Sequence, residues 1–388
     1  GSEMCIRDRL TAGVLFLFTR NISKALSVLM VDYSCAIKLA TPISVISAMK
    51  EASARKIMIK GGKFMELFAR ADTIVFDKTG TLTSACPQVT QIVPLSDCSR
   101  EYILKTAACL EEHFPHSVAR AVVRKALEEG LHHEEEHAEV EYIVAHGISS
   151  RLHGKKVLVG SYHFLFEDEG ILLTEEQRQT IRSHARGKSN IFLAIGRRAI
   201  GMIGVSDPPR PEARETIARL KRQGISSIIM LTGDSESAAR AISRQLGITE
   251  YRSQVLPEDK ARFIQQLKQS GRTVCMVGDG INDSPALSCA DVSVSMKDSS
   301  DIAREVADIS LLSSSLSELA VLRELSCAVL EKIERNYRFI VGFNTSLILL
   351  GMFGLITPAL SAFLHNASTV YVSARSTRRC LPPVGTPQ

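Results

Sequence analysis

The sequence predicts an α/β protein in which a parallel sheet carries an inserted α+β domain and is flanked by transmembrane helices. Over roughly 280 residues, short β-rich runs alternate with helical patterns, and each clear strand ends at a polar cluster. Residues 84–198 interrupt this alternation with helices and hairpins of their own. Apolar residues gather at the two ends of the chain, which indicates contact with a membrane.

Length and composition narrow the class of protein. A chain of 388 residues is too long for one ordinary hydrophobic core, so more than one domain is expected. The formal net charge of +5 is mild, and the basic residues lack the interleaved aromatic residues of a nucleic-acid groove, so no nucleic-acid partner is expected. Nine cysteines without a Cys-x-x-Cys pair argue against a zinc ribbon or a disulfide framework and favour a reducing compartment.

The N-terminal part is predicted to contain a leader and membrane helices. Residues 1–9 match no structural pattern, and we interpret them as a non-native leader. Residues 10–50 are interpreted as membrane helices, one of them truncated because its apolar run is shorter than a bilayer crossing requires. The second is complete but interrupted by Asp32, Lys38 and Pro42, and such interruptions are typical of an ion path.

The C-terminal part is predicted to contain two further membrane helices, at residues 321–374, with Pro358 between them. Basic residues precede the first and follow the second, and an excess of Lys and Arg marks the cytoplasmic side of a membrane. Residues 375–388 are therefore interpreted as a cytoplasmic tail. We expect an integral, multi-pass membrane protein whose other domains lie in the cytoplasm.

Four strand candidates organise the central region, at residues 73–76, 227–231, 273–277 and 292–294. In open parallel sheets, ligands bind beyond the carboxyl ends of the strands. Asp77 follows the first strand, a Thr-Gly-Asp run at 232–234 follows the second, and Asp279 follows the third. The sequence therefore predicts that these polar side chains form one site.

The run DKTGTLT at residues 77–83 is the strongest motif in the chain. A carboxylate at a strand end can attack the γ-phosphorus of ATP in line and form an aspartyl phosphate. At all seven positions the run resembles the phosphorylation motif of P-type ATPases, and TGD at 232–234, PEDK at 257–260 and GDGIND at 278–283 follow in that family's order. The chain thus resembles the catalytic half of a P-type ATPase of the heavy-metal subgroup, with a haloacid dehalogenase-like phosphorylation domain.

The resemblance implies a phosphorylation domain at residues 51–83 and 199–320. Asp77 is the implied nucleophile, Thr232 is expected to hydrogen-bond the phosphoryl oxygens, and Lys260 is expected to neutralise developing charge. Mg²⁺ is expected to bind Asp77, the Thr79 carbonyl and Asp279. The other implied catalytic residues are Lys78, Thr79, Gly233, Asp234, Asn282 and Asp283.

Thr79 bears on the choice between two kinds of enzyme. Soluble phosphatases of the haloacid dehalogenase superfamily usually carry an aspartate two residues after the nucleophile, where it acts as general acid and base in hydrolysis. With Thr79 at that position, the phosphoenzyme is expected to live long enough to drive a conformational change. ATP-driven transport of a transition metal is the function we expect; a soluble-type phosphatase and a non-transporting metal-binding membrane protein remain alternatives.

The inserted region, residues 84–198, resembles the nucleotide-binding domain of the heavy-metal subgroup. The resemblance implies ATP contacts at Glu111, His116, Gly147 and Gly160. The sequence departs from the subgroup's pattern at three positions: Ser117 replaces its Pro, Ala145 replaces its first Gly and Ser161 replaces its Asn. Loss of a glycine where the backbone approaches a ligand is expected to weaken ATP binding.

The run YSCAIKLATP at residues 33–42 resembles the ion motif of the subgroup, which carries Cys-Pro-Cys or a variant of it. Only Cys35 keeps a thiolate, and a single soft ligand disfavours two-coordinate Cu(I) and favours Zn²⁺, Mn²⁺, Fe²⁺ or Co²⁺. For Ser368, helix-to-helix hydrogen bonding is the alternative to a ligand role. The candidates for the transported ion are Ser34, Cys35, Asn344, His365, Asn366 and Ser368.

A complete member of the subgroup also has earlier membrane helices and an actuator domain with a Thr-Gly-Glu loop, and no Thr-Gly-Glu occurs here. We therefore expect a fragment that lacks the N-terminal half of the same protein. It is expected to accept a phosphoryl group on Asp77 but not to complete a transport cycle. The expected cofactors and partners are ATP, Mg²⁺, a heavy-metal cation and the lipid bilayer, which we take to be a bacterial plasma membrane.

Overall fold

The chain divides into two compact units, each described separately below. The α/β unit comprises residues 72–290 and 298–306, and the helical unit comprises residues up to 71, 291–297 and those from 307 onward. The computed structural model describes residues 14, 16–17, 20–31, 33–112, 117–131, 141–143, 147–152, 154–185, 188–234, 236–280 and 283–382.

A run of parallel strands forms the centre of the α/β unit, in the order β11-β2-β9-β10. All residues of β2, β9 and β11 are buried, as expected of a parallel sheet covered on both faces. The strands predicted at 73–76, 227–231 and 273–277 are confirmed to within one residue at each end. The strand bounds are β2 Thr73–Asp77, β9 Ser227–Leu231, β10 Glu250–Arg252 and β11 Val274–Gly278.

Helices cover this sheet and return the chain between its strands. Ile264, Leu287 and Ala303, from three different helices, pack with Val75 and Met276 in one core on a single face of the sheet. Strands β9, β10 and β11 each lead at the carboxyl end into a helix, and β2 leads into the turn at 78–82. Because these strands are parallel, the turns after them share one edge of the sheet. The helix bounds are α8 Ala213–Arg222, α9 Glu236–Leu246, α10 Pro257–Gln269, α11 Ser284–Cys289 and α12 Asp301–Val306.

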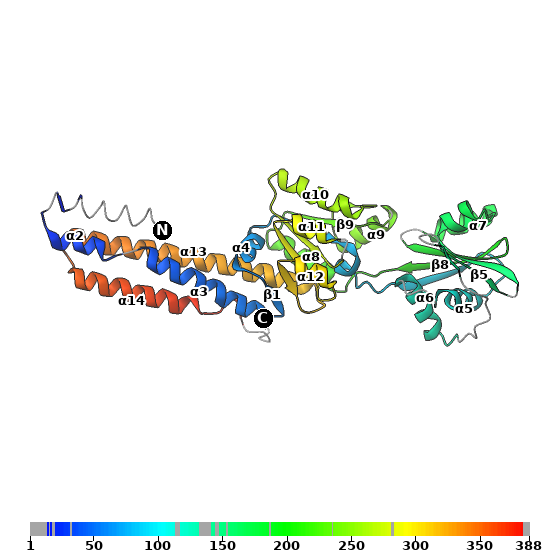
Figure 1. Ribbon diagram of the computed structural model, residues 1–388, viewed down its shortest axis with the longest axis horizontal. Coiled ribbons are helices and arrows are strands. Elements are labelled where there is room, and N and C mark those ends of the chain that lie inside the picture. Colours follow the sequence, from blue (N-terminus) through cyan, green and yellow to red (C-terminus); the bar gives the residue numbers. More distant parts are fainter. Residues whose placement is uncertain are drawn as a thin grey trace. The chain divides into compact units, whose positions relative to one another are not determined.

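The inserted domain is an antiparallel sheet of six strands in the order β3-β8-β7-β6-β5-β4, with helices on both faces (Figure 1). Helices α5 and α6 pack on one face and α7 on the other. We placed the end of this domain at residue 198, but β8 pairs with β3 and β7, so the sheet continues to Ser206. The bounds are β3 Gln88–Pro94, α5 Arg100–Glu111, α6 Ser117–Glu128, β4 Glu141–Ile143, β5 Gly147–Leu152, β6 Lys155–Gly160, α7 Glu175–His184, β7 Ser189–Ile195 and β8 Arg198–Ser206.

The helical unit is built around two long helices, α13 and α14, that pack against α3. The apolar stretch after residue 20 is two helices rather than one, since α2 ends at Leu29 and α3 begins at Tyr33. The two helices expected at residues 321–374 correspond to α13, which begins four residues earlier at Ser317, and to α14, which begins at Pro358. The bounds are α2 Ile22–Leu29, α3 Tyr33–Ala54, β1 Ile57–Ile59, α4 Gly62–Arg70, β12 Val292–Ser295, β13 Ile309–Leu311, α13 Ser317–Met352 and α14 Pro358–Ser376.

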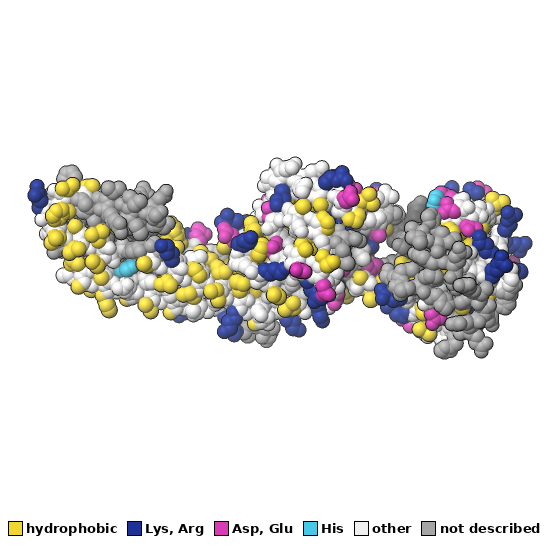
Figure 2. Space-filling model, in the orientation of Figure 1, with side chains coloured by type: hydrophobic (Ala, Val, Ile, Leu, Met, Phe, Trp, Pro, Cys, Tyr) yellow, Lys and Arg dark blue, Asp and Glu magenta, His cyan; other side chains and the backbone are white. Residues whose placement is uncertain are grey.

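Large apolar side chains are exposed on the helical unit, over α2, the end of α13 and α14 (Figure 2). Ile22, Phe353, Phe363 and Val370 each keep more than 60% of their surface exposed, at 65%, 74%, 68% and 69%. Among the described residues, however, no helix has both the length and the apolar composition that a membrane crossing requires.

Candidate phosphoryl-transfer site

Asp77 is the last residue of β2, where the buried run Ile-Val-Phe before it fixes its backbone in the middle of the sheet. The Lys260 ammonium, from the first turn of α10, lies 2.5 Å from Asp77 Oδ1 and 2.7 Å from Asp283 Oδ1. All three side chains are buried. One cation thus links two carboxylates that come from different turns of the sheet edge.

Burial and the neighbouring Asp283 carboxylate raise the pKa of Asp77 to about 6, although Lys260 and a hydrogen bond from the Thr79 backbone N–H act in the opposite direction. Burial also raises the pKa of Asp279 to about 7, and the charges of Asp77 and Asp283 add to this effect. Burial lowers the pKa of Lys260, but the two carboxylates outweigh it and raise that pKa above the ordinary value of lysine. The site therefore holds more negative charge than it can balance itself.

Asp77, Asp279 and Asp283 each offer an oxygen, and these oxygens lie within 4.8 Å of one another. Carboxylate oxygens are the ligands that Mg²⁺ prefers, and three carboxylates against one lysine leave two negative charges for a divalent ion to balance. These residues therefore fit Mg²⁺. The predicted pair Asp77 and Asp279 is brought together, and Asp283, which we expected only as a catalytic residue, joins the group.

Gly80 makes the close approach of the turn to Asp279 possible. Its φ is +73°, and a Cβ added there would lie 1.4 Å from Asp279 Oδ2. A side chain at this position would therefore strain the left-handed backbone and displace the carboxylate that faces it.

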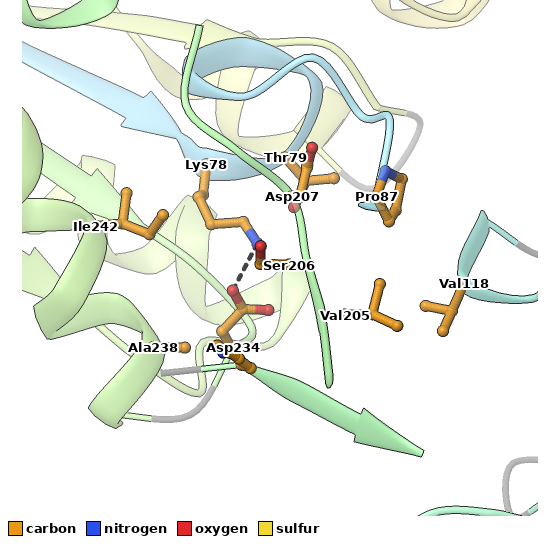
Figure 3. A pocket seen from close by; sticks show the side chains of 11 residues that line it. Lys78, Thr79, Pro87, Val118, Val205, Ser206, Asp207, Asp234, Ala238 and Ile242 are labelled. Atoms are coloured by element: carbon orange, nitrogen blue, oxygen red, sulfur yellow. Dashed lines mark hydrogen bonds and ion pairs between the residues drawn. The ribbon is translucent and has the colours of Figure 1, made fainter. Parts of the chain in front are cut away.

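The second half of the site is a cavity of about 180 Å³ beside the turn after Asp77. Figure 3 shows Lys78 pointing toward Asp234, and the two side chains form an ion pair at 2.5 Å. Thr232 is buried at the end of β9, and its hydroxyl accepts a hydrogen bond from the Asp234 N–H at 3.1 Å, while Gly233 is exposed. Thr232, Gly233 and Asp234 thus form a turn directly after β9, at the strand end where the sequence placed them.

Arg210 is a residue that the sequence analysis missed. Its buried guanidinium donates to the carbonyls of Thr81 and Gly80 at 2.9 and 2.8 Å, and its backbone N–H donates to the Leu82 carbonyl at 2.9 Å. Close by, the Thr83 hydroxyl donates to Asp207. The segment that returns from the inserted domain thus holds the turn after Asp77, and its Asp-Pro-Pro-Arg run at 207–210 was the available signal.

Arg210→Met is expected to lower the free energy of unfolding by about 3 kcal/mol, because two buried carbonyls lose a charged donor. Arg214→Met is the matched control, since Arg214 lies one turn further along and is exposed. Chemical denaturation of both variants measures the difference. Equal losses in the two variants would show that Arg210 does not hold the turn.

Comparison with known proteins agrees with this geometry. A family model described as a haloacid dehalogenase-like hydrolase matches residues 71–291, which is more than half of the chain. The chain belongs to this hydrolase family. It is also 36% identical over 372 residues to a zinc-exporting P-type ATPase of Mycobacterium marinum, covering 95% of this chain and 50% of that protein.

Two further proteins resemble this haloacid dehalogenase-like hydrolase over nearly its whole length. A manganese-exporting P-type ATPase of Mycobacterium leprae is 36% identical over 369 residues, with 95% of this chain and 51% of that protein covered. The crystal structure of a zinc-transporting PIB-type ATPase in the E2.Pi state is 29% identical with a TM-score of 0.83, and the match covers 97% of this chain and 62% of that one. The hydrolase thus spans about half the length of the curated relatives it matches.

The inserted domain of the hydrolase brings two of the expected nucleotide-binding residues together. Gly147 and Gly160 are direct cross-strand partners on β5 and β6. A Cβ on Gly147 would lie 2.4 Å from the Val159 carbonyl oxygen and 2.5 Å from the Phe164 ring, so local packing already requires this glycine. Glu111 ends α5 and is buried, and burial raises its pKa to about 7. His116 and Asn282 lie outside the described residues.

The candidates for the transported ion are brought together only in part. His365 of α14 and Asn344 of α13 are both buried, with 3.4 Å between His365 Nδ1 and Asn344 Oδ1. Cys35 and Asn366 are exposed. The Ser368 hydroxyl donates to the His365 carbonyl of its own helix at 2.8 Å, so this bond does not connect two helices. The backbone of Ser34 lies in α3, but its side chain is outside the described part of the structure.

Proposed function

We propose that this chain is the catalytic half of a heavy-metal-transporting P-type ATPase and that it transfers the γ-phosphoryl group of ATP to Asp77. The observation that carries the proposal is the Lys260 ammonium, which contacts the Asp77 and Asp283 carboxylates at 2.5 and 2.7 Å. Relatives of this hydrolase include exporters of zinc, of manganese and of copper, which supports this class of transporter.

In the proposed reaction, a carboxylate oxygen of Asp77 attacks the γ-phosphorus of ATP. The bond from that phosphorus to the bridging oxygen breaks, and ADP leaves with the electron pair. A pKa of about 6 leaves Asp77 mostly ionised at neutral pH, as a nucleophile must be. Lys260 offsets charge on the transferring group. Mg²⁺ bound by Asp77, Asp279, Asp283 and the Thr79 carbonyl would balance the phosphate charge.

The residue at position 79 distinguishes a pump from a phosphatase in this proposal. Thr79 has no carboxylate to activate water, so the acyl phosphate on Asp77 is expected to persist. A long-lived phosphoenzyme can drive a conformational change before it is hydrolysed. The Thr79 side chain thus favours transport over the soluble-type phosphatase alternative.

The helical unit is the membrane part of the proposed protein. Exposed apolar side chains on α2, α13 and α14 would be stabilised by lipid, and the α/β unit would then lie in the cytoplasm. Asn344 and His365 offer oxygen and nitrogen donors, which suit a borderline divalent ion better than Cu(I). Transport itself is proposed for the whole protein, and a scan of its ATPase activity over divalent ions and Cu(I) would test the choice of ion.

Incubation of the purified chain with Mg²⁺ and γ-labelled ATP tests the phosphoryl transfer. The label is expected to survive acid and to be released by hydroxylamine, as an acyl phosphate is, whereas α-labelled ATP should leave no label. Fast release of inorganic phosphate without a trapped adduct would favour the phosphatase alternative. Absence of both would contradict the proposal.

A further inference from the structure

Lys188, at the amino end of β7, lines the cavity beside the turn after Asp77, although no sequence motif singled it out. The cavity is bounded on one side by Lys78, Thr79 and Asp234 of the parallel-sheet domain. On the other side it is bounded by Lys188 and Val118 of the inserted domain. The Lys188 side chain thus reaches from the inserted domain into the cavity that the turn after Asp77 also lines.

A chain of contacts holds Lys188 at this place. Its ammonium donates to Gln91 Oε1 at 2.8 Å, and Gln91 Nε2 donates in turn to the His184 carbonyl at 2.6 Å, which fixes the orientation of the Gln91 amide. Gly204 lies opposite Gln91 at an irregularity in the pairing of β3 with β8. A Cβ on Gly204 would lie 2.7 Å from Gln91 Cγ, so the glycine makes room for the side chain that holds Lys188.

The charge of Lys188 is not balanced by a carboxylate within the described residues, where its side-chain partner is a neutral amide. The other cavity lysine, Lys78, is already paired with Asp234. Among the described residues around the site, and apart from Lys188, five carboxylates lie near three cations. The carboxylates belong to Asp77, Asp207, Asp234, Asp279 and Asp283, and the cations to Lys78, Arg210 and Lys260. A polyphosphate entering this negative surrounding needs a further positive group.

We propose that Lys188 binds the polyphosphate chain of ATP from the inserted domain and so aligns the nucleotide with Asp77. The proposal rests on the proposed function, because it takes ATP as the substrate. Lys188 contacts substrate in this arrangement, and Gln91 and Gly204 act as positioning residues. An ammonium that keeps only a neutral partner can turn to a phosphate without breaking an ion pair.

Nucleotide binding by the intact chain tests this role without requiring phosphoryl transfer. Lys188→Met is expected to weaken binding of Mg²⁺ with a non-hydrolysable ATP analogue about 10-fold or more, which is the loss expected for one charge-assisted contact. Binding of adenosine, which lacks phosphates, should change less than about twofold. Lys188→Arg should restore most of the analogue affinity.

Lys155→Met is the control, because Lys155 is an exposed lysine of the same domain and starts the neighbouring strand β6. It should bind both ligands as the unaltered chain does. Unchanged analogue binding by Lys188→Met, or an equal loss for adenosine, would overturn the proposal. If the unaltered chain binds the analogue but never becomes labelled on Asp77, the proposed function fails while the role of Lys188 stands.

Discussion

Replacing Asp77 with asparagine is expected to abolish the acid-stable label while leaving the fold at least as stable as before. The amide nitrogen and oxygen of asparagine cannot attack phosphorus as a carboxylate does, so no acyl phosphate can form. Asparagine has nearly the same shape, and its oxygen can still accept hydrogen bonds from Lys260 and from the Thr79 N–H, the two donors that Asp77 has.

The effect on stability follows from the raised pKa of Asp77. The folded protein holds the Asp77 proton up to about pH 6, whereas the unfolded chain releases it near 3.8. Ionisation in the folded state is therefore unfavourable, and this destabilisation grows as the pH rises from about 4 to about 6 and stays constant above that. Two pKa units correspond to roughly 3 kcal/mol at most, so Asp77→Asn should raise the free energy of unfolding by about 1–3 kcal/mol at neutral pH without Mg²⁺.

Labelling and thermal unfolding of the same preparation measure both effects, at pH 4 and at pH 7.5. Asp298→Asn is the control, since Asp298 is an exposed carboxylate of the same unit, and it should keep the label and the original pH dependence of stability. The gain in stability from Asp77→Asn should be large at pH 7.5 and small at pH 4. A label that survives in Asp77→Asn would place the nucleophile elsewhere, and a large loss of stability would contradict the charge argument.

The sequence predicts the edge of the parallel sheet well because each feature there is local. Asp77 ends one short, fully buried strand, and Thr232 and Asp279 directly follow two others. Parallel pairing brings the ends of such strands together whatever lies between them. The bounds of β9 are therefore predicted to the residue. The position of Lys260 can also be predicted from the sequence, because this residue lies in the first turn of a helix that starts at a proline.

Features that depend on contacts between distant segments are much harder to predict. Arg210 binds carbonyls about 130 positions earlier in the chain, and Lys188 is held by Gln91 across the inserted sheet. Neither contact leaves a periodic pattern or a charged partner that could be read from the sequence. The assignment of β8 to the inserted domain is equally hard to predict, because it depends on pairing with β3, which lies more than 100 residues earlier, and with β7.

Gly80→Ala is expected to lower the initial rate of labelling by at least about 100-fold, which is the loss that follows when reacting groups are displaced by about 1 Å. The new Cβ would lie 1.4 Å from Asp279 Oδ2 and 2.2 Å from Asp279 Cγ, so the carboxylate must leave its present position beside Asp77 and Asp283. Moving it separates the oxygens that fit Mg²⁺. Labelling should therefore also require a higher Mg²⁺ concentration than in the unaltered chain.

Gly271→Ala separates this displacement from backbone strain, because Gly271 also has a positive φ, +84°, but has no atom within 4 Å of an added Cβ. In both variants an alanine in the left-handed conformation lowers the free energy of unfolding by roughly 1 kcal/mol. Only Gly80→Ala must also displace a carboxylate. Stability should therefore fall further in Gly80→Ala, and only that variant should lose labelling. Equal initial rates of labelling in the two variants would mean that displacing the Asp279 carboxylate does not slow phosphoryl transfer. The three carboxylates would then not form the metal site inferred from their geometry.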